Sequence, residues 1–536
     1  MSKRLTVWRC YAALLVCLVA ARGLFVMSIL PPFEGWDEYQ HIAFIEHLIE
    51  HGSEPVMGQS IVPRSMHADL VRYPHPPFGA EQVRRLGGVD YEQYWSLNEP
   101  PTLVPDARDL PLYQAQQPPL YYRLVAPLYA GLKADGGMLP AITGLRLVNV
   151  WLCAAAVAVA LGSISFLFGP TAHRYPVGLI VATQPLYLLN CARVANDALA
   201  VLLGSICVAM LFQLLSRWSW WRAVVAGMTL GLSILSKTNL LGLIPFVLVV
   251  CLWLAWRRKA AWGRAVAGPA IIFGITAAIT LPYFRANVAR HGVMTPLQEA
   301  VRNEASGRGV ADLARAAAEI DWRRDFVMRL FRQSLWRGGW SMLGLDTPIL
   351  GIRQPLPTLY GAIVACSIIA AVIAAGRRRL GRSVFAGGGR TSLAIGALGA
   401  GMMAALAYHA IHSQAAVGNI GTNVWYGAVV FPWLICLVYA GLGKLPWRRA
   451  AIGVMAIWLV VQVMAEWAGT LNVMVQAYYG ERWNEGAAAR INSLHPAGWG
   501  ADLTVRGIVC ASVCLLIVLG IAARKVSNHR EGGISA

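Results

Sequence analysis

The sequence predicts an all-α membrane protein with about twelve transmembrane helices, and three observations lead to this fold class. First, 57% of the 536 residues are hydrophobic and only 14% are charged, well below the quarter that is usual in soluble domains. Second, apolar runs of about 20 residues recur along the chain, each long enough to cross about 30 Å of hydrocarbon. Third, the basic residues gather in short stretches between these runs.

The apolar runs set the order of the elements. The runs expected to span the membrane are 8–30, 142–168, 175–190, 194–215, 222–237, 239–256, 265–284, 355–376, 391–411, 424–442, 450–469 and 504–523. The first run is longer than a signal-peptide core and has no small-residue cleavage site before Pro31, so we expect a retained helix. The runs 175–190 and 222–237 are short enough to be tilted or broken helices, and a count of eleven or thirteen spans also fits.

Charge sets the orientation of these spans. Basic clusters occur at every second boundary, at 3–9, 217–222, 256–264, 376–382, 444–449 and 524–525. Cytoplasmic loops carry the excess of Lys and Arg, so both chain ends are expected in the cytoplasm. The chain then divides into a cytoplasmic N-terminus with the first span (1–30), a large extracytoplasmic loop (31–141), spans two to seven (142–284), a second outer loop (285–354), spans eight to eleven (355–469), a third outer loop (470–503), and the last span with a cytoplasmic tail (504–536).

The net charge of +19 does not indicate a nucleic-acid-binding protein, because membrane topology alone explains where the basic residues lie. Membrane lipids and a lipid phosphate are the expected partners. The sequence has no Gly-rich phosphate loop and no cytoplasmic segment large enough to bind a nucleotide. Any chemistry is therefore expected on the outer face, with a substrate that carries its own energy.

The stretch "PPFEGWDEYQHIAF" (31–44) places two adjacent carboxylates, Asp37 and Glu38, directly after the first span. The residues that follow, up to Gly52, have the apolar spacing of an amphipathic helix at the membrane surface. In one interpretation the carboxylates only cap this helix and complement its dipole. In the other, a carboxylate at the outer mouth of the bundle takes a proton from an attacking hydroxyl. His41, one turn after Asp37, makes a divalent cation a further candidate, although no cofactor is firmly implied.

Basic residues on the outer side are candidates for binding a lipid phosphate. Lys237 lies at the outer end of the fifth span, where it either snorkels or binds phosphate as a point charge. Arg285 and Arg290 follow the seventh span, against the positive-inside bias, which suits bidentate phosphate binding or interface anchoring. Arg193 is the fourth candidate for binding the lipid phosphate. It is also a candidate partner for Asp197, as is a substrate, because a carboxylate at that depth requires a partner.

Other polar and aromatic residues are candidates for contacting a substrate. These are His41, Arg72, His75, Tyr121, Tyr122, Asn196, Asp197, Asn287, Trp336 and Trp340. Asn196 and Asp197 would also cap the fourth span, and the two tryptophans would stack on a sugar ring or belong to an interfacial belt.

Seven short motifs occur in order over most of the chain: "PPFEGWDEYQH" (31–41), "QQPPLYYRLVAP" (116–127), "GLRLVNV" (144–150), "RVANDALAVLL" (193–203), "LGLSILSKTNLLGLIP" (230–245), "FRANVARHG" (284–292) and "SLWRGGW" (334–340). With the Asp-Glu pair after the first span, they resemble the GT-C class of membrane glycosyltransferases, which includes protein O-mannosyltransferases and lipid A aminoarabinose transferases. More narrowly, they resemble the bacterial DUF2142 branch. One departure lies at 423–443, where relatives usually carry an Arg-Tyr pair before the proline and this sequence has no Arg.

The resemblance implies an inverting glycosyltransferase that takes a sugar from a polyprenyl phosphate and transfers it to a cell-envelope glycan, a lipid or a protein. It also implies that Asp37 is the catalytic base and that Glu38 positions the acceptor or holds a metal. Two alternatives stay open: a glycan ligase or polymerase that uses polyprenyl diphosphate donors, and a transporter or flippase of lipid-linked sugars. The ligases usually concentrate arginines in a large late outer loop, and transporters often have inverted repeats, and neither feature is visible in this sequence.

Overall fold

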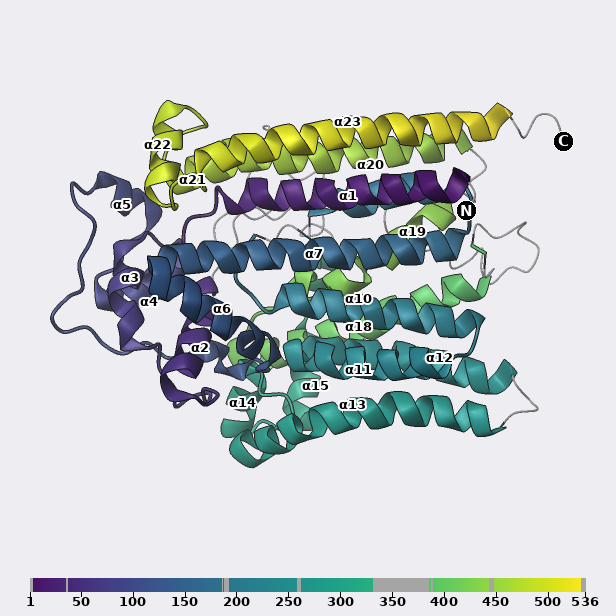
Figure 1. Cartoon of the computed structure of the whole chain (residues 1–536). Coiled ribbons are helices and arrows are strands. Elements are labelled where there is room, and N and C mark those ends of the chain that lie inside the picture. Colours follow the sequence, from purple (N-terminus) through teal and green to yellow (C-terminus); the bar gives the residue numbers. More distant parts are fainter. Residues whose placement is uncertain are drawn as a thin grey trace.

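The structure of the protein, a computed structural model, describes residues 3–34, 37–185, 187, 192–257, 262–330, 385–386, 389–442 and 448–531. Long helices run side by side in a bundle, and the start of α1 and the end of α23 lie at the same end of it (Figure 1). The bundle helices are α1 (Lys3–Met27), α7 (Met138–Phe168), α8 (Arg174–Ala182), α10 (Asp197–Ser216), α11 (Trp220–Ser236), α12 (Ile244–Arg257), α13 (Trp262–His291), α18 (Gly389–Val417), α19 (Phe431–Leu442), α20 (Arg448–Ala468) and α23 (Ala501–Glu531).

Within the described residues, nine helices are long and apolar enough to cross a membrane, judged by length and composition. They confirm the predicted all-α membrane fold. The run 175–190 begins with the short α8, which ends at Ala182, just before Thr183 and Pro185. The run 222–237 forms the short apolar helix α11. The predicted span 355–376 lies outside the described residues.

Most of the short helices gather at the other end of the bundle, which we call the loop end (Figure 1). Besides the bundle helices, the described residues form the helices α2 (Glu38–His51), α3 (His67–Arg72), α4 (Pro77–Val83), α5 (Tyr91–Ser96), α6 (Leu120–Gly136), α14 (Gln298–Ala305), α15 (Val310–Glu319), α21 (Val475–Tyr479) and α22 (Glu485–Ser493). The remaining helical turns are η1 (Arg64–Met66), η2 (Arg84–Leu86), η3 (Tyr113–Gln116), η4 (Thr238–Leu243), η5 (Trp322–Met328), η6 (Val424–Val430) and η7 (Gly469–Met474). The polar regions predicted after the first, seventh and eleventh spans therefore contribute helices to the same end of the bundle.

Buried ionic contacts fix the loop end to the bundle. The Glu34 carboxylate, just after α1, accepts hydrogen bonds from the hydroxyls of Tyr91 and Tyr478, the latter at 2.9 Å. Deeper in α1, Arg22 pairs with Glu466 of α20 and donates to the carbonyl oxygens at the end of α8. An arginine inside an apolar bundle is stable only when its donors are satisfied in this way. The Glu34 contacts join the end of α1 to α5 and α21 of the loop end, and the Arg22 contacts join α1 to α20 and α8 within the bundle.

Candidate active site

A cavity of about 870 Å³ lies where segments of the loop end meet α18, η4 and η6. Its polar lining includes Asp37, Arg193, Lys237, Glu299 and His409. Its apolar lining comes from Leu241, Gly242 and Pro245 around the start of α12, and from Gly401, Ala404 and Ala405 of α18. A space of this size and mixed character suits a ligand with a polar and an apolar part.

Asp37 occupies the N-cap position of α2, but its side chain makes no capping hydrogen bond. One carboxylate oxygen instead accepts a hydrogen bond from Arg193 Nη1 at 2.5 Å, and the other accepts from Gln114 Nε2 at 2.6 Å. The Nε2 atom of His41 lies 3.6 Å from the second oxygen. The capping interpretation is therefore right about the position of Asp37 and wrong about the side chain, which faces the cavity. The predicted helix end is confirmed, because Gly52 adopts the left-handed conformation with φ of 65°.

The electrostatics of the cavity keep Asp37 ionised. Burial alone would raise the pKa of the carboxyl, but the charges of Arg193, His41 and Lys237 together outweigh it and lower the pKa below its ordinary value of 3.8. The Asp37 side chain retains 23% of its surface exposed, so it can still be reached from the cavity. Asp37 is thus an anionic acceptor of protons and hydrogen bonds at neutral pH.

The cations Arg193 and Lys237 are joined through Asp197, the first residue of α10. Arg193 Nη2 lies 3.1 Å from one Asp197 oxygen, and Lys237 Nζ lies 2.6 Å from the other. Arg193 belongs to the non-helical segment before α10. Lys237 directly follows α11 and has an extended backbone. Both cations therefore lie at helix ends. Lys237 Nζ also lies 5.0 Å from the centre of the Tyr426 ring. Two cations therefore sit beside the Asp37 carboxylate.

Glu38, the neighbour of Asp37, does not line the cavity. Its carboxylate is fully buried and accepts from Arg146 Nε at 2.9 Å, from Arg146 Nη2 at 2.6 Å and from the Val194 backbone N–H at 2.8 Å. Arg146 also donates to the carbonyl oxygens of Leu30 and Pro31, at 2.6 and 2.7 Å. Glu38 thereby links the chain before Asp37 to the segment that carries Arg193.

Tyr121, Tyr122 and His41 form a buried polar layer behind Asp37. His41 Nδ1 lies 2.7 Å from the Tyr122 hydroxyl, and burial holds the pKa of that hydroxyl well above its ordinary range, so Tyr122 stays neutral. The Tyr121 hydroxyl donates to Asn149 Oδ1 at 3.1 Å, and Asn149 in turn donates to the Arg193 carbonyl oxygen at 2.6 Å. Of these, only His41 reaches the cavity wall, and the others position its neighbours.

The other predicted site residues lie away from the cavity lining or outside the described residues. Asn196 donates to the Ser236 carbonyl oxygen at 2.6 Å, and Asn287 donates to the Met294 carbonyl oxygen at 3.0 Å. His75 is fully buried, stacked on Phe33, and desolvation lowers the pKa of its imidazole to about 4. The exposed residues of the set are Arg72, Arg285 and Arg290. Trp336 and Trp340 lie outside the described residues.

Among the residues that the structure describes, no group of three or more His, Cys, Asp or Glu side chains stands close enough to hold a metal ion. The candidate set of Asp37, Glu38 and His41 does not converge, because Glu38 turns away toward Arg146.

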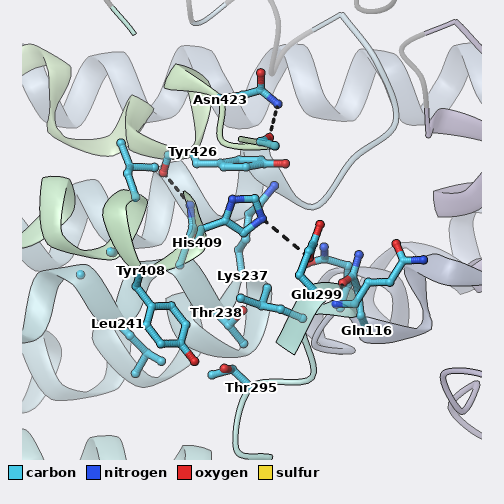
Figure 2. Close-up of a pocket in the computed structure, with 18 of the residues that line it drawn as sticks. Gln116, Lys237, Thr238, Leu241, Thr295, Glu299, Tyr408, His409, Asn423 and Tyr426 are labelled. Atoms are coloured by element: carbon cyan, nitrogen blue, oxygen red, sulfur yellow. Dashed lines mark hydrogen bonds and ion pairs between the residues drawn. The ribbon is translucent and has the colours of Figure 1, made fainter. Parts of the chain in front are cut away.

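Several cavity residues were not singled out from the sequence: Gln114, Glu299, His409 and Tyr426, together with the supporting Arg146. Two of them carried a signal, since Arg146 and His409 are ionisable residues within long apolar runs, where such residues need a partner or a function. Glu299 and Gln114 lie in polar loops and carried none. Tyr426 lies in the segment 423–443, where relatives usually carry an Arg-Tyr pair and this sequence has no Arg. In the structure the cation beside the Tyr426 ring is Lys237 (Figure 2).

No protein-family model matches the sequence, nor does any curated protein. Among solved structures, the chain is similar to ArnT from Cupriavidus metallidurans bound to undecaprenyl phosphate, with 14% identity, a TM-score of 0.46, and coverage of 97% of this chain and 72% of that one. The apo state of the same protein gives 15% identity, a TM-score of 0.45 and coverage of 98% and 72%. An oligosaccharyltransferase from Archaeoglobus fulgidus, tethered with an acceptor peptide, gives 15% identity, a TM-score of 0.43 and coverage of 88% and 55%.

All three TM-scores lie below 0.5, so the GT-C resemblance of this chain stays a prediction from its sequence motifs. At such scores the similarities assign no residue and no substrate to this chain. The narrower likeness to the DUF2142 branch is not confirmed.

Proposed function

We propose that this chain is an integral membrane glycosyltransferase that moves a sugar from a polyprenyl-phosphate donor to an extracytoplasmic acceptor, with inversion and with Asp37 as the general base. The observation that carries the proposal is the ionised carboxylate of Asp37 in one cavity with two cations, Arg193 and Lys237. A carboxylate and a phosphate-binding pair are the two parts that this reaction needs.

The reaction breaks the bond between the anomeric carbon and the phosphate oxygen and forms a bond from that carbon to the acceptor oxygen. The leaving polyprenyl phosphate keeps the bonding electrons and gains negative charge, which Lys237 and the Arg193 fork would stabilise. Asp37 takes the proton that the acceptor hydroxyl loses. The donor supplies the free energy, so no nucleotide is consumed.

Arg193 would couple donor binding to the strength of the base. In the free protein Arg193 donates to Asp37 at 2.5 Å and contributes to the low pKa of that carboxyl. A donor phosphate competes for the same guanidinium. As Arg193 turns toward the phosphate, the pKa of Asp37 rises and the carboxylate becomes a stronger base at the moment when the donor is in place.

The membrane placement belongs to the same proposal: the loop end faces the extracytoplasmic side of a bacterial inner membrane. It is supported by the polar helices at one end of the bundle and by the start of α1 and the end of α23 at the other (Figure 1). A cysteine introduced at the exposed Ser96 of α5 should react in intact cells with a membrane-impermeant thiol reagent. Protection of that cysteine until the cells are lysed would place the cavity on the wrong side.

The proposed activity is tested by reconstituting the protein in vesicles with polyprenyl phosphates that carry a labelled pentose or hexose, together with cell-envelope acceptors. We expect transfer of label and release of polyprenyl monophosphate, which Asp37→Asn slows by roughly 10²–10⁴-fold. Asp109→Asn is the matched control, because Asp109 forms an exposed ion pair with Arg64. Activity only with diphosphate donors would indicate a glycan ligase, and movement of intact donor between leaflets would indicate a flippase.

A further inference from the structure

The cavity has a second polar wall, which the proposed reaction has not yet used. Glu299 of α14 and His409 of α18 point toward each other on this wall, and Gln116 of η3 lies beside Glu299 (Figure 2). These residues come from three segments far apart in the sequence, and the fold brings them to one surface.

A hydrogen bond occupies one ring nitrogen of His409. His409 Nδ1 lies 2.8 Å from the Thr422 hydroxyl oxygen, and either atom can be the donor. The other ring nitrogen, Nε2, faces Glu299 and is the one left to bind a ligand.

The Glu299 carboxylate accepts hydrogen bonds, and it does not bond to His409 directly. Its Oε2 atom lies 3.9 Å from His409 Nε2, beyond hydrogen-bond distance. In the part of the chain that the structure describes, no arginine or lysine forms an ion pair with Glu299. The 3.9 Å separation leaves one oxygen of Glu299 and Nε2 of His409 side by side on the cavity wall, where two neighbouring polar groups of a ligand can each bind one of them.

The neighbours of this pair supply the rest of a sugar site. The Gln116 side-chain oxygen accepts from the Gln298 backbone N–H at 2.7 Å, which leaves its amide nitrogen as the group that can donate to a ligand. The Tyr426 ring lies 5.6 Å from the His409 ring and 5.0 Å from Lys237 Nζ. Since Tyr426 contacts both, the pair lies next to the proposed phosphate position, where the sugar bonded to that phosphate would be.

We propose that Glu299 and His409 bind two neighbouring hydroxyl groups of the transferred sugar and thereby select donors that carry such a pair. This inference rests on the proposed function, because it assumes that the donor phosphate binds at Lys237 and Arg193. The Glu299 carboxylate accepts a hydrogen bond from one hydroxyl, and His409 Nε2 forms a hydrogen bond with the next. The pair acts on binding of the sugar and leaves the proton transfer to Asp37.

The test measures equilibrium binding to the full-length protein in lipid nanodiscs, by displacement of a tail-labelled polyprenyl phosphate. The competitors are bare polyprenyl phosphate, a panel of polyprenyl-phosphate pentoses and hexoses, and the monodeoxy derivatives of the tightest-binding member. The variants are Glu299→Gln and His409→Asn, since the asparagine amide can still form a hydrogen bond with Thr422 but is too short to reach the ligand. Glu304→Gln, exposed on the same helix and outside the cavity lining, is the matched control.

We expect at least one sugar-bearing lipid to bind the parent more tightly than bare polyprenyl phosphate. Glu299→Gln and His409→Asn should each weaken binding of that sugar-bearing lipid on the order of tenfold to a hundredfold and leave binding of bare polyprenyl phosphate unchanged. Removing one hydroxyl of the pair should weaken binding to the parent but not to Glu299→Gln, which is the signature of direct contact.

Two results would overturn the inference: both variants keep the parental preference for the sugar-bearing lipid, or no panel member binds better than the bare lipid. Failure of the proposed donor site gives a different pattern. In that case the parent does not bind bare polyprenyl phosphate, or Lys237→Gln binds that lipid as well as the parent does. Either result contradicts the donor site and, with it, the sugar site.

Discussion

Replacing Glu38 by glutamine should destabilise the protein strongly, because the Glu38 carboxylate accepts three hydrogen bonds in a fully buried position, two from Arg146 and one from the Val194 N–H. A glutamine side chain offers one oxygen, and its amide nitrogen cannot accept. At least one donor is left without a partner, and the Arg146 charge, 3% exposed, loses its counter-ion.

The cost follows from that loss. Breaking a buried ion pair by removing one partner costs about 3–5 kcal/mol, whereas removing both charges costs much less. The double variant Glu38→Leu with Arg146→Met should therefore recover part of the stability lost in Glu38→Gln. The recovery is incomplete, since Arg146 also bonds to the Leu30 and Pro31 carbonyl oxygens.

Thermal unfolding of the purified protein in detergent, followed by tryptophan fluorescence, measures this effect. Glu38→Gln should lower the unfolding midpoint by several degrees relative to the parent, and any loss of transfer should follow the loss of folded protein. The reasoning is refuted if Glu38→Gln unfolds at the parental temperature but does not transfer sugar. That result would give Glu38 the direct role in acceptor or metal binding that the family resemblance implies.

Two further predictions concern the pH profile and the packing of the cavity. Because Arg193 lowers the pKa of Asp37, kcat/KM, which reports the free enzyme, should fall on acidification only below the ordinary pKa of 3.8. Arg193→Gln raises the pKa of Asp37, so the fall in kcat/KM should move to higher pH. An unchanged pH profile in Arg193→Gln would contradict the role of Asp37 as the base. A Cβ on Gly401 would lie 2.5 Å from the Gly242 carbonyl oxygen, so Gly401→Ala should cost about 1–3 kcal/mol of stability and reduce donor binding by pushing α18 from η4. Gly396→Ala, on the same helix with nothing within 4 Å, should leave the unfolding midpoint unchanged or slightly raised, and equal effects of the two substitutions would contradict the packing argument.

The sequence was sufficient to predict the helical membrane fold, because long apolar runs and basic loops depend only on composition and order. It also singled out Asp37, Arg193 and Lys237, which the structure brings into one cavity. Each of these residues stands at the edge of an apolar run, where a charge is costly without a partner. Such positions can be recognised one residue at a time.

What the sequence could not show depends on pairing over long separations. Asp37 and Glu38 are adjacent and chemically alike, yet one faces the cavity and the other pairs with Arg146, 108 residues further along the chain. Likewise, Glu299 and His409 become neighbours only because α14 packs against α18, so the sequence alone does not show that they form a pair. Arg285 and Arg290 had the right charge and are exposed in the structure, away from the cavity lining.

The most direct test of Asp37 as the base compares binding and transfer in the same preparation of Asp37→Asn. Donor binding is measured with the labelled polyprenyl-phosphate sugar that the parent transfers, and a single turnover is then followed after acceptor is added. We predict that Asp37→Asn binds the donor at least as well as the parent, since Arg193 is released to the phosphate, and transfers roughly 10²–10⁴-fold more slowly. Transfer at the parental rate by a folded, donor-bound Asp37→Asn protein would contradict the role of Asp37.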